Sequence, residues 1–142
     1  MAKNNALAPD IKPSNSLLGY LTEPFIVNKQ ATDAAMQAYP LKEQVDMRGD
    51  AFRHLVGSAL LAKRKGVPYA EFITGLHEAK WLPVIGGMGN SPAETQMDTY
   101  NNTLGIDIAK KAKSYDDIVN LAKQYIETNR AKTMAAPSYD SY

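Results

Sequence analysis

The residues of this chain that could do chemistry lie near its middle, where both histidines, His54 and His77, are found. On a helix, Asp50 lies one turn before His54. By the same spacing, Asp98 lies one turn before Asn102. Polar side chains on helix faces that are otherwise apolar need partners, and the nearest partners are one another or a bound ion. The spacing therefore predicts a polar cluster, which is a candidate site.

Asp50 and His54 are spaced so that a carboxylate can orient an imidazole. Such a contact fixes the tautomer and raises the basicity of the ring, which suits a general base or a metal ligand. The alternative is a helix cap at Asp50 and a histidine whose hydrogen bonds are satisfied in the core. Arg53 beside them could neutralise a carboxylate, bind an anion or form a surface salt bridge.

His77 and Glu78 are adjacent, so on a helix their side chains diverge by about 100° and only one can point straight into a cleft. The pattern differs from that of a zincin, which needs a second histidine four residues after the first, where this chain has Trp81. A zinc site would need both histidines together with carboxylates such as Glu78 or Asp98.

Three oxygen-bearing residues, Glu94, Asp98 and Asn102, fall on one stripe of a predicted helix, with Asn101 beside them. Oxygen ligands in this arrangement suit a hard cation or a carboxylate pair, and the alternative is a solvated helix face. Two asparagines in mid-helix favour a specific role, because asparagine is a poor helix former. Gly105 predicts the close approach of a neighbouring helix.

These patterns define a set of candidate residues with titratable or oxygen-bearing side chains. We predict catalytic roles for His54, His77, Glu78 and Asp98, metal ligation by His54, His77, Glu78, Asp98 and Asn102, and supporting roles for Asp50, Arg53, Glu94 and Asn101. A cofactor at this site is expected to be a divalent cation.

The composition is that of a single domain with tails: the chain has 142 residues, of which 44% are hydrophobic and 22% charged. A net charge of +1 gives no indication of nucleic-acid binding. The absence of cysteine excludes disulfides, thiolate metal sites and a cysteine nucleophile. No apolar run has the length of a transmembrane helix, and the first residues lack the apolar core of a signal peptide, so general secretion is not expected.

Gly66 is typical of a helix end, and Ser91 with Glu94 and Ser114 with Asp117 are typical of helix starts. No strand alternation and no internal repeat is present. We therefore predict an all-α fold, a small bundle of about four helices with an extended N-terminal arm and a short C-terminal tail. The predicted helices cover residues 31–39, 50–65, 68–81, 91–113 and 114 onward.

The first 30 residues are not expected to form a packed element, because Pro9, Pro13 and Pro24 interrupt any helical period. The apolar residues at 17–21 and 25–27 would not stay bare in water. They belong either to a strap on their own domain or to an arm that packs on a neighbouring subunit. The predicted organisation is an arm with a short helix over 1–45, a helical domain over 46–131 and a tail over 132–142.

Three blocks of the sequence resemble a family of domains with the pattern Asp-Ala-Phe-Arg-His, then His-Glu, then Met-Asp-x-x-Asn-Asn-x-x-Gly. The blocks are residues 50–54, 77–78 and 97–105, and the resemblance covers about residues 46 to 112. Similar domains occur in bacterial wall-associated or toxin-like proteins and in phage-encoded proteins. The resemblance implies that the candidate residues of the three blocks converge, either in a catalytic pocket or in a structural polar core.

Three functions follow as hypotheses. The first, which we favour as the setting because of the two arms and the missing signal peptide, is a bacteriophage virion or tail-associated accessory protein. Located in the virion or the host cytoplasm, it would bind the subunits of a larger assembly through its arms. The second is a hydrolase of a cell-envelope polymer or lipid, with His54 or His77 as base, supported by Asp50, and with Glu78 or Asp98 as acid or ion ligand. The third is a non-enzymatic cation-binding domain.

Overall fold

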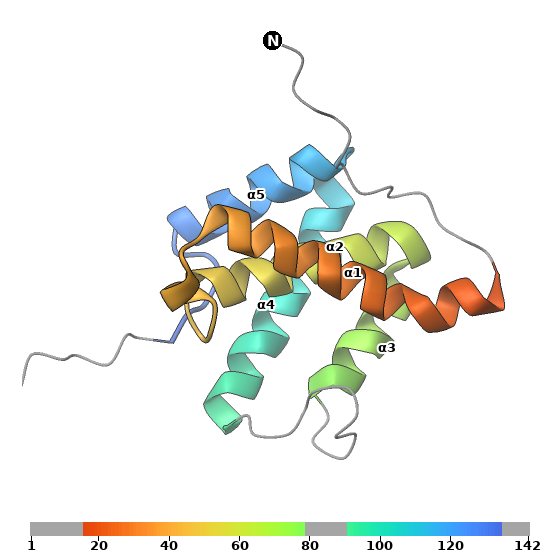
Figure 1. Ribbon diagram of the computed structural model, residues 1–142, viewed down its shortest axis with the longest axis horizontal. Helices are drawn as coiled ribbons and strands as arrows, with labels where there is room; N and C mark the ends of the chain where they lie inside the picture. The colour runs from red at the N-terminus through yellow and green to blue at the C-terminus, as the bar shows by residue number, and fades with distance from the viewer. Residues whose placement is uncertain (1–15, 79–90, 135–142) are drawn as a thin grey trace, which may run out of the picture.

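The computed structural model describes residues 16–78 and 91–134, and within these ranges the chain is helical, without a strand. This confirms the predicted all-α class. Figure 1 shows α1 crossing in front of α2, with α5 above them and α3 and α4 extending below. No described helix is long and apolar enough to cross a membrane. The elements are α1 (Leu17–Ala38), the 3-10 turn η2 (Leu41–Glu43), α2 (Arg48–Lys65), α3 (Val67–Glu78), α4 (Pro92–Lys111) and α5 (Tyr115–Glu127).

The core is built around α2, which packs against each of the other four α-helices. Its apolar side chains Phe52, Leu55, Val56 and Leu60 are fully buried. Burial of side chains of this size stabilises the fold by about 1.5–3 kcal/mol each. Gly105 brings α4 so close to α2 that a Cβ atom there would lie 2.5 Å from the Leu55 carbonyl oxygen, which confirms the predicted close approach.

The prediction of an extended N-terminal arm is wrong from residue 17 onward, because α1 is one helix of 22 residues. Ser16 caps this helix by accepting a hydrogen bond in its first turn. Pro24 lies inside the helix and removes the amide that would donate to the Tyr20 carbonyl. The hydroxyl of Tyr69 donates to that carbonyl instead, at 2.5 Å. A contact from α3 thus replaces the lost bond, and sequence spacing gives no sign of it.

The described residues share a single hydrophobic core that extends from α1 to α5. Val27, Ala31 and Ala35 of α1 belong to it, so this part of the predicted arm packs into the helical domain. At the other end, the Met134 amide donates to the Asp46 carbonyl at 2.6 Å. The first residues of the predicted tail therefore also contact the domain.

The other predicted helices are present, with small shifts at their ends. Asp50 is not the cap of α2, which begins at Arg48; its carboxylate accepts a hydrogen bond from the Asp46 amide at 3.1 Å. The predicted capping box of Ser91 and the predicted cap at Ser114 are confirmed. The predictions for residues 1–15, for the helix end at 79–81 and for the tail after 134 fall outside the described residues.

Candidate functional site

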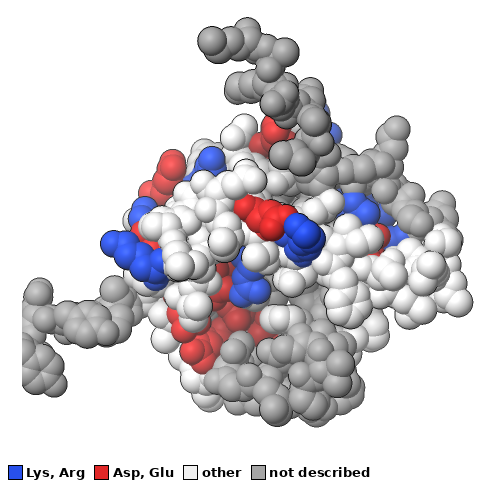
Figure 2. Space-filling model, viewed as in Figure 1, with Lys and Arg blue, Asp and Glu red and all other residues white. Residues whose placement is uncertain are grey.

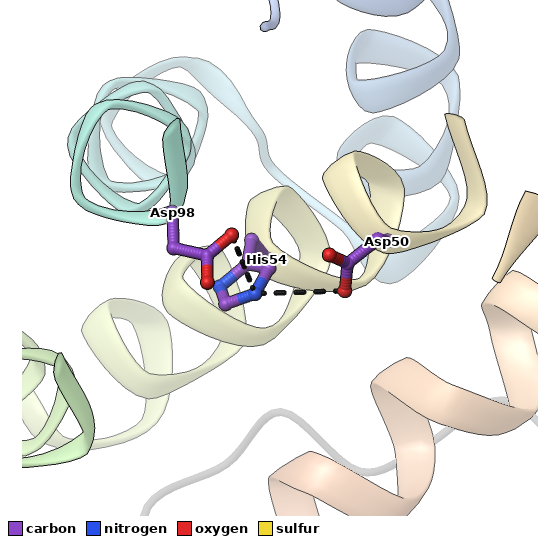
Figure 3. Close-up of side chains that lie close together, drawn as sticks. All are labelled: Asp50, His54 and Asp98. Atoms are coloured by element: carbon purple, nitrogen blue, oxygen red, sulfur yellow. Dashed lines mark ion pairs between the residues drawn. The ribbon is translucent and has the colours of Figure 1, made fainter. Parts of the chain in front are cut away.

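His54 lies on α2 and is buried against α4, as Figure 3 shows. Its Nδ1 atom is 3.0 Å from Oδ1 of Asn102 on α4. The Asn102 amide is oriented from its other side, because Nδ2 donates to Oε1 of Glu78 at 3.4 Å. An amide oxygen can only accept, so His54 donates from Nδ1 and a neutral ring has its lone pair on Nε2.

Two carboxylates face Nε2 of His54, one from α2 and one from α4 (Figure 3). Oδ1 of Asp98 lies 3.2 Å from this nitrogen and Oδ1 of Asp50 lies 3.7 Å from it. One ligand atom from each of the three residues lies within 4.8 Å of the others. The Arg53 guanidinium forms an ion pair with Asp50. The cluster therefore offers one nitrogen and two oxygens as donors, from α2 and α4.

The pKa values in this cluster reflect burial and an excess of negative charge. Burial, reinforced by the charges of Glu78 and Asp50, raises the pKa of Asp98 to about 7. Burial also lowers the pKa of His54, and the positive charge of Arg53 acts in the same direction. Both shifts favour the neutral forms of Asp98 and His54, so the cluster disfavours a charge on either of these side chains.

His77 lies on α3 beside this cluster, and its side chain is 35% exposed. Its Nδ1 atom is 3.1 Å from Oε1 of the buried Glu78 side chain. A carboxylate at Nδ1 favours the proton there, so the lone pair lies on Nε2. The His77 ring meets that of His54 edge to face, with centroids 6.0 Å apart. Because Glu78 also accepts from Asn102, polar contacts connect His77 to His54.

A groove of about 740 Å³ runs between α1, α2 and α3. Both histidines, Arg53 and Asn102 line it. His54 and His77 each lie about three turns from the junction of α2 and α3 at Gly66, so these polar groups gather at one end. Apart from Asn28, Ser58 and Thr74, the rest of the walls is apolar or aromatic and includes Tyr20, Leu21, Phe25, Leu61, Tyr69, Phe72 and Ile73.

Two of the predicted site residues lie elsewhere. The Glu94 carboxylate accepts a hydrogen bond from the Ser91 amide in the capping box of α4. Asn101 is fully buried and exchanges two hydrogen bonds with the backbone of Lys132, at 2.8 and 2.9 Å. Asn101 therefore anchors the C-terminal segment. The structure brings together the remaining candidates Asp50, Arg53, His54, His77, Glu78, Asp98 and Asn102.

Sequence reasoning missed the groove, because one of its walls belongs to α1, in the segment predicted to be extended. A signal was present in the apolar side chains at 17–27, which needed a partner surface. Leu21 and Phe25 from this run lie at the groove and remain exposed.

A family model described as Domain of unknown function (DUF6973) matches residues 19–134. The matched range contains all the helices but the first residues of α1, and it includes the whole of the polar cluster. No curated protein and no solved structure matched the chain.

Proposed function

This chain belongs to the DUF6973 family, and we propose that it hydrolyses an ester bond in a lipid, with His77 as the general base. The observation that carries the proposal is the setting of His77. It is a partly exposed imidazole, oriented by a buried carboxylate, on the wall of an apolar groove. A lipid of the cell envelope is a substrate that fits this setting.

His77 suits the role of base better than His54. A general base must reach the proton that it removes, and His77 combines exposure with a position on the groove. His54 is buried, and both its nitrogens face side chains of α2 and α4. Glu78 favours the tautomer in which Nε2 of His77 can accept a proton. Asn102 restrains Glu78 in turn.

The groove favours a lipid over a polysaccharide. Beyond its polar end the walls are mostly apolar and aromatic, and its volume lies in the range of about 300–1,000 Å³ that is typical of small-molecule sites. Leu21, Phe25 and Phe72 at the groove are 62–75% exposed. Exposed apolar side chains beside a pocket suit contact with a lipid aggregate from which the substrate is drawn.

In the proposed reaction, Nε2 of His77 takes a proton from water while the water oxygen attacks the ester carbonyl carbon. The bond between that carbon and the alcohol oxygen then breaks. The proton passes from His77 to the departing oxygen, which yields a carboxylic acid and an alcohol. Arg53 lines the same end of the groove, and its positive charge favours the oxyanion that forms between the two steps.

The test is hydrolysis of p-nitrophenyl esters with acyl chains of increasing length. We expect wild-type rates to rise with chain length and His77→Ala to lower kcat by about 10²-fold or more. Asp33→Asn is the matched control, because it removes an exposed carboxylate that is paired with Lys29 and does not line the groove. Equal rates for wild type and His77→Ala would falsify the proposal.

The second candidate function is that of a subunit in a larger assembly such as a phage particle. It is favoured by the apolar side chains at the start of α1, where Leu17 and Leu18 are 78% and 69% exposed. An assembly interface would bury these side chains in a partner. Sedimentation of the protein as a monomer, unchanged by Leu18→Ser, would count against this function.

A further inference from the structure

We propose that Asp50, His54 and Asp98 bind a divalent transition-metal cation such as Zn²⁺ between α2 and α4. This site lies behind the groove: of the three residues, only His54 lines it. The inference goes beyond the proposed hydrolysis and does not depend on it.

The donor set and its spacing fit such an ion. Imidazole nitrogen combined with carboxylate oxygen suits Zn²⁺, whereas Mg²⁺ and Ca²⁺ prefer oxygen alone. Ligands of a tetrahedral ion with bonds near 2.0–2.1 Å lie about 3.3 Å apart. Nε2 of His54 lies 3.2 Å from Asp98 and 3.7 Å from Asp50, close to this separation. Small side-chain movements would therefore place three of the four ligands of a tetrahedral ion, and a water molecule would supply the fourth.

The state of Nε2 is an independent indication of a ligand. His54 is 93% buried, and among the described residues Nε2 has no hydrogen-bond partner. Its lone pair points towards carboxylate oxygens, which are themselves acceptors. Two acceptors at 3.2 Å repel each other unless a proton or a cation lies between them. A metal ion resolves this conflict for both carboxylates at once.

The surrounding contacts are those that support metal ligands. A ligating histidine commonly donates its other ring N–H to a carbonyl or carboxylate, and Nδ1 of His54 meets the Asn102 carbonyl oxygen. Asp50 is oriented by the Arg53 guanidinium and by the Asp46 amide. With Glu78 nearby, the site carries three carboxylates against one guanidinium, so a divalent cation would bring it closer to neutrality.

The test uses untagged full-length protein, stripped with a chelator and then titrated with ZnCl₂. We expect one zinc ion per chain by calorimetry. At a free zinc concentration of 100 times Kd, the melting temperature should rise on the order of 10 °C. Asp98→Asn keeps the side-chain size and removes one anionic ligand. It should weaken zinc binding at least 10-fold, while its metal-free melting temperature is no lower than that of wild type.

His77→Ala is the control, because it removes the other histidine and leaves the three ligands in place. It should keep the zinc-induced rise, which separates this inference from the proposed hydrolase. His54→Gln should abolish the rise. The inference fails if zinc does not bind, if Asp98→Asn binds it as tightly as wild type, or if Mg²⁺ and Ca²⁺ give the same rise.

Discussion

Charged side chains are buried at both ends of α2, but the balance of positive and negative charge differs between the two ends. Near its carboxyl end, Arg64 forms an ion pair with Glu23 of α1, and both side chains are buried. Near its amino end, Asp50 and Asp98 face a histidine whose neutral form is favoured. One end matches a positive charge with a negative one, whereas the other holds more carboxylates than its one guanidinium, that of Arg53, can balance.

This difference indicates what each end does. A buried charge is tolerated when a partner and hydrogen bonds compensate for lost water, so the balanced pair fits a role in joining α1 to α2. At the amino end, the raised pKa of Asp98 means that its surroundings disfavour the ionised form of this side chain. Ionisable groups with strongly shifted pKa values are typical of functional sites. With the proposed zinc site, the group that stabilises the fold and the group that binds a ligand would lie at opposite ends of one helix.

The largest expected effect comes from breaking the balanced pair with Glu23→Gln. This change removes the negative charge from the buried ion pair with the Arg64 guanidinium, so we expect a loss of about 3–5 kcal/mol in the free energy of unfolding. Urea unfolding measures the loss as a lower midpoint. The double variant Glu23→Met with Arg64→Met removes both charges and should regain most of the stability. A loss below about 1 kcal/mol for Glu23→Gln would contradict the assigned role.

The same kind of substitution at the other end should act in the opposite direction. At pH 8 and without metal, Asp98→Asn should stabilise the protein by about 1–2 kcal/mol, because it removes a carboxylate whose pKa is raised to about 7. The raised pKa means that the folded state binds this proton more tightly than the unfolded chain. The contribution of Asp98 to stability is therefore full below about pH 4 and is lost as the pH rises to about 7.

The pH dependence supplies the control for this second prediction. Asparagine does not titrate, so wild type and Asp98→Asn should have similar stability at pH 4 and diverge towards pH 8. Urea unfolding in a chelator at both pH values measures the difference. A variant that is less stable than wild type at pH 8 would show that the Asp98 carboxylate is favourably compensated.

The elements that carry the site were predictable from local signals. Ser91 with Glu94 marks the start of α4, and Gly66 marks the end of α2, because caps are local chemistry. The one-turn spacing of Asp50 and His54 also predicts that both side chains share a helix face. Burial of that face against α4 then brings them to Asp98.

The partners of individual side chains were not predictable. Asn101 and Asn102 are neighbours of the same type, yet they point about 100° apart on the helix. One anchors Lys132 and the other orients His54, and which of them meets the cluster depends on how α4 is rotated in the bundle. The partner of Pro24 was not predictable either. The proline predicted a break in the helix, but a hydroxyl from α3 replaces the hydrogen bond that it removes.

The smallest expected effect tests whether the Tyr69 hydroxyl replaces the hydrogen bond that Pro24 removes, near the carboxyl end of α2. Tyr69→Phe removes the hydroxyl that donates to the Tyr20 carbonyl, so we expect a loss of about 1 kcal/mol in the free energy of unfolding. Pro24→Ala supplies a backbone amide that can donate to the same carbonyl. In that background Tyr69→Phe should cost little, and a double-mutant cycle by urea unfolding measures the coupling. An equal cost in both backgrounds would show that the hydroxyl does not replace the bond that Pro24 removes.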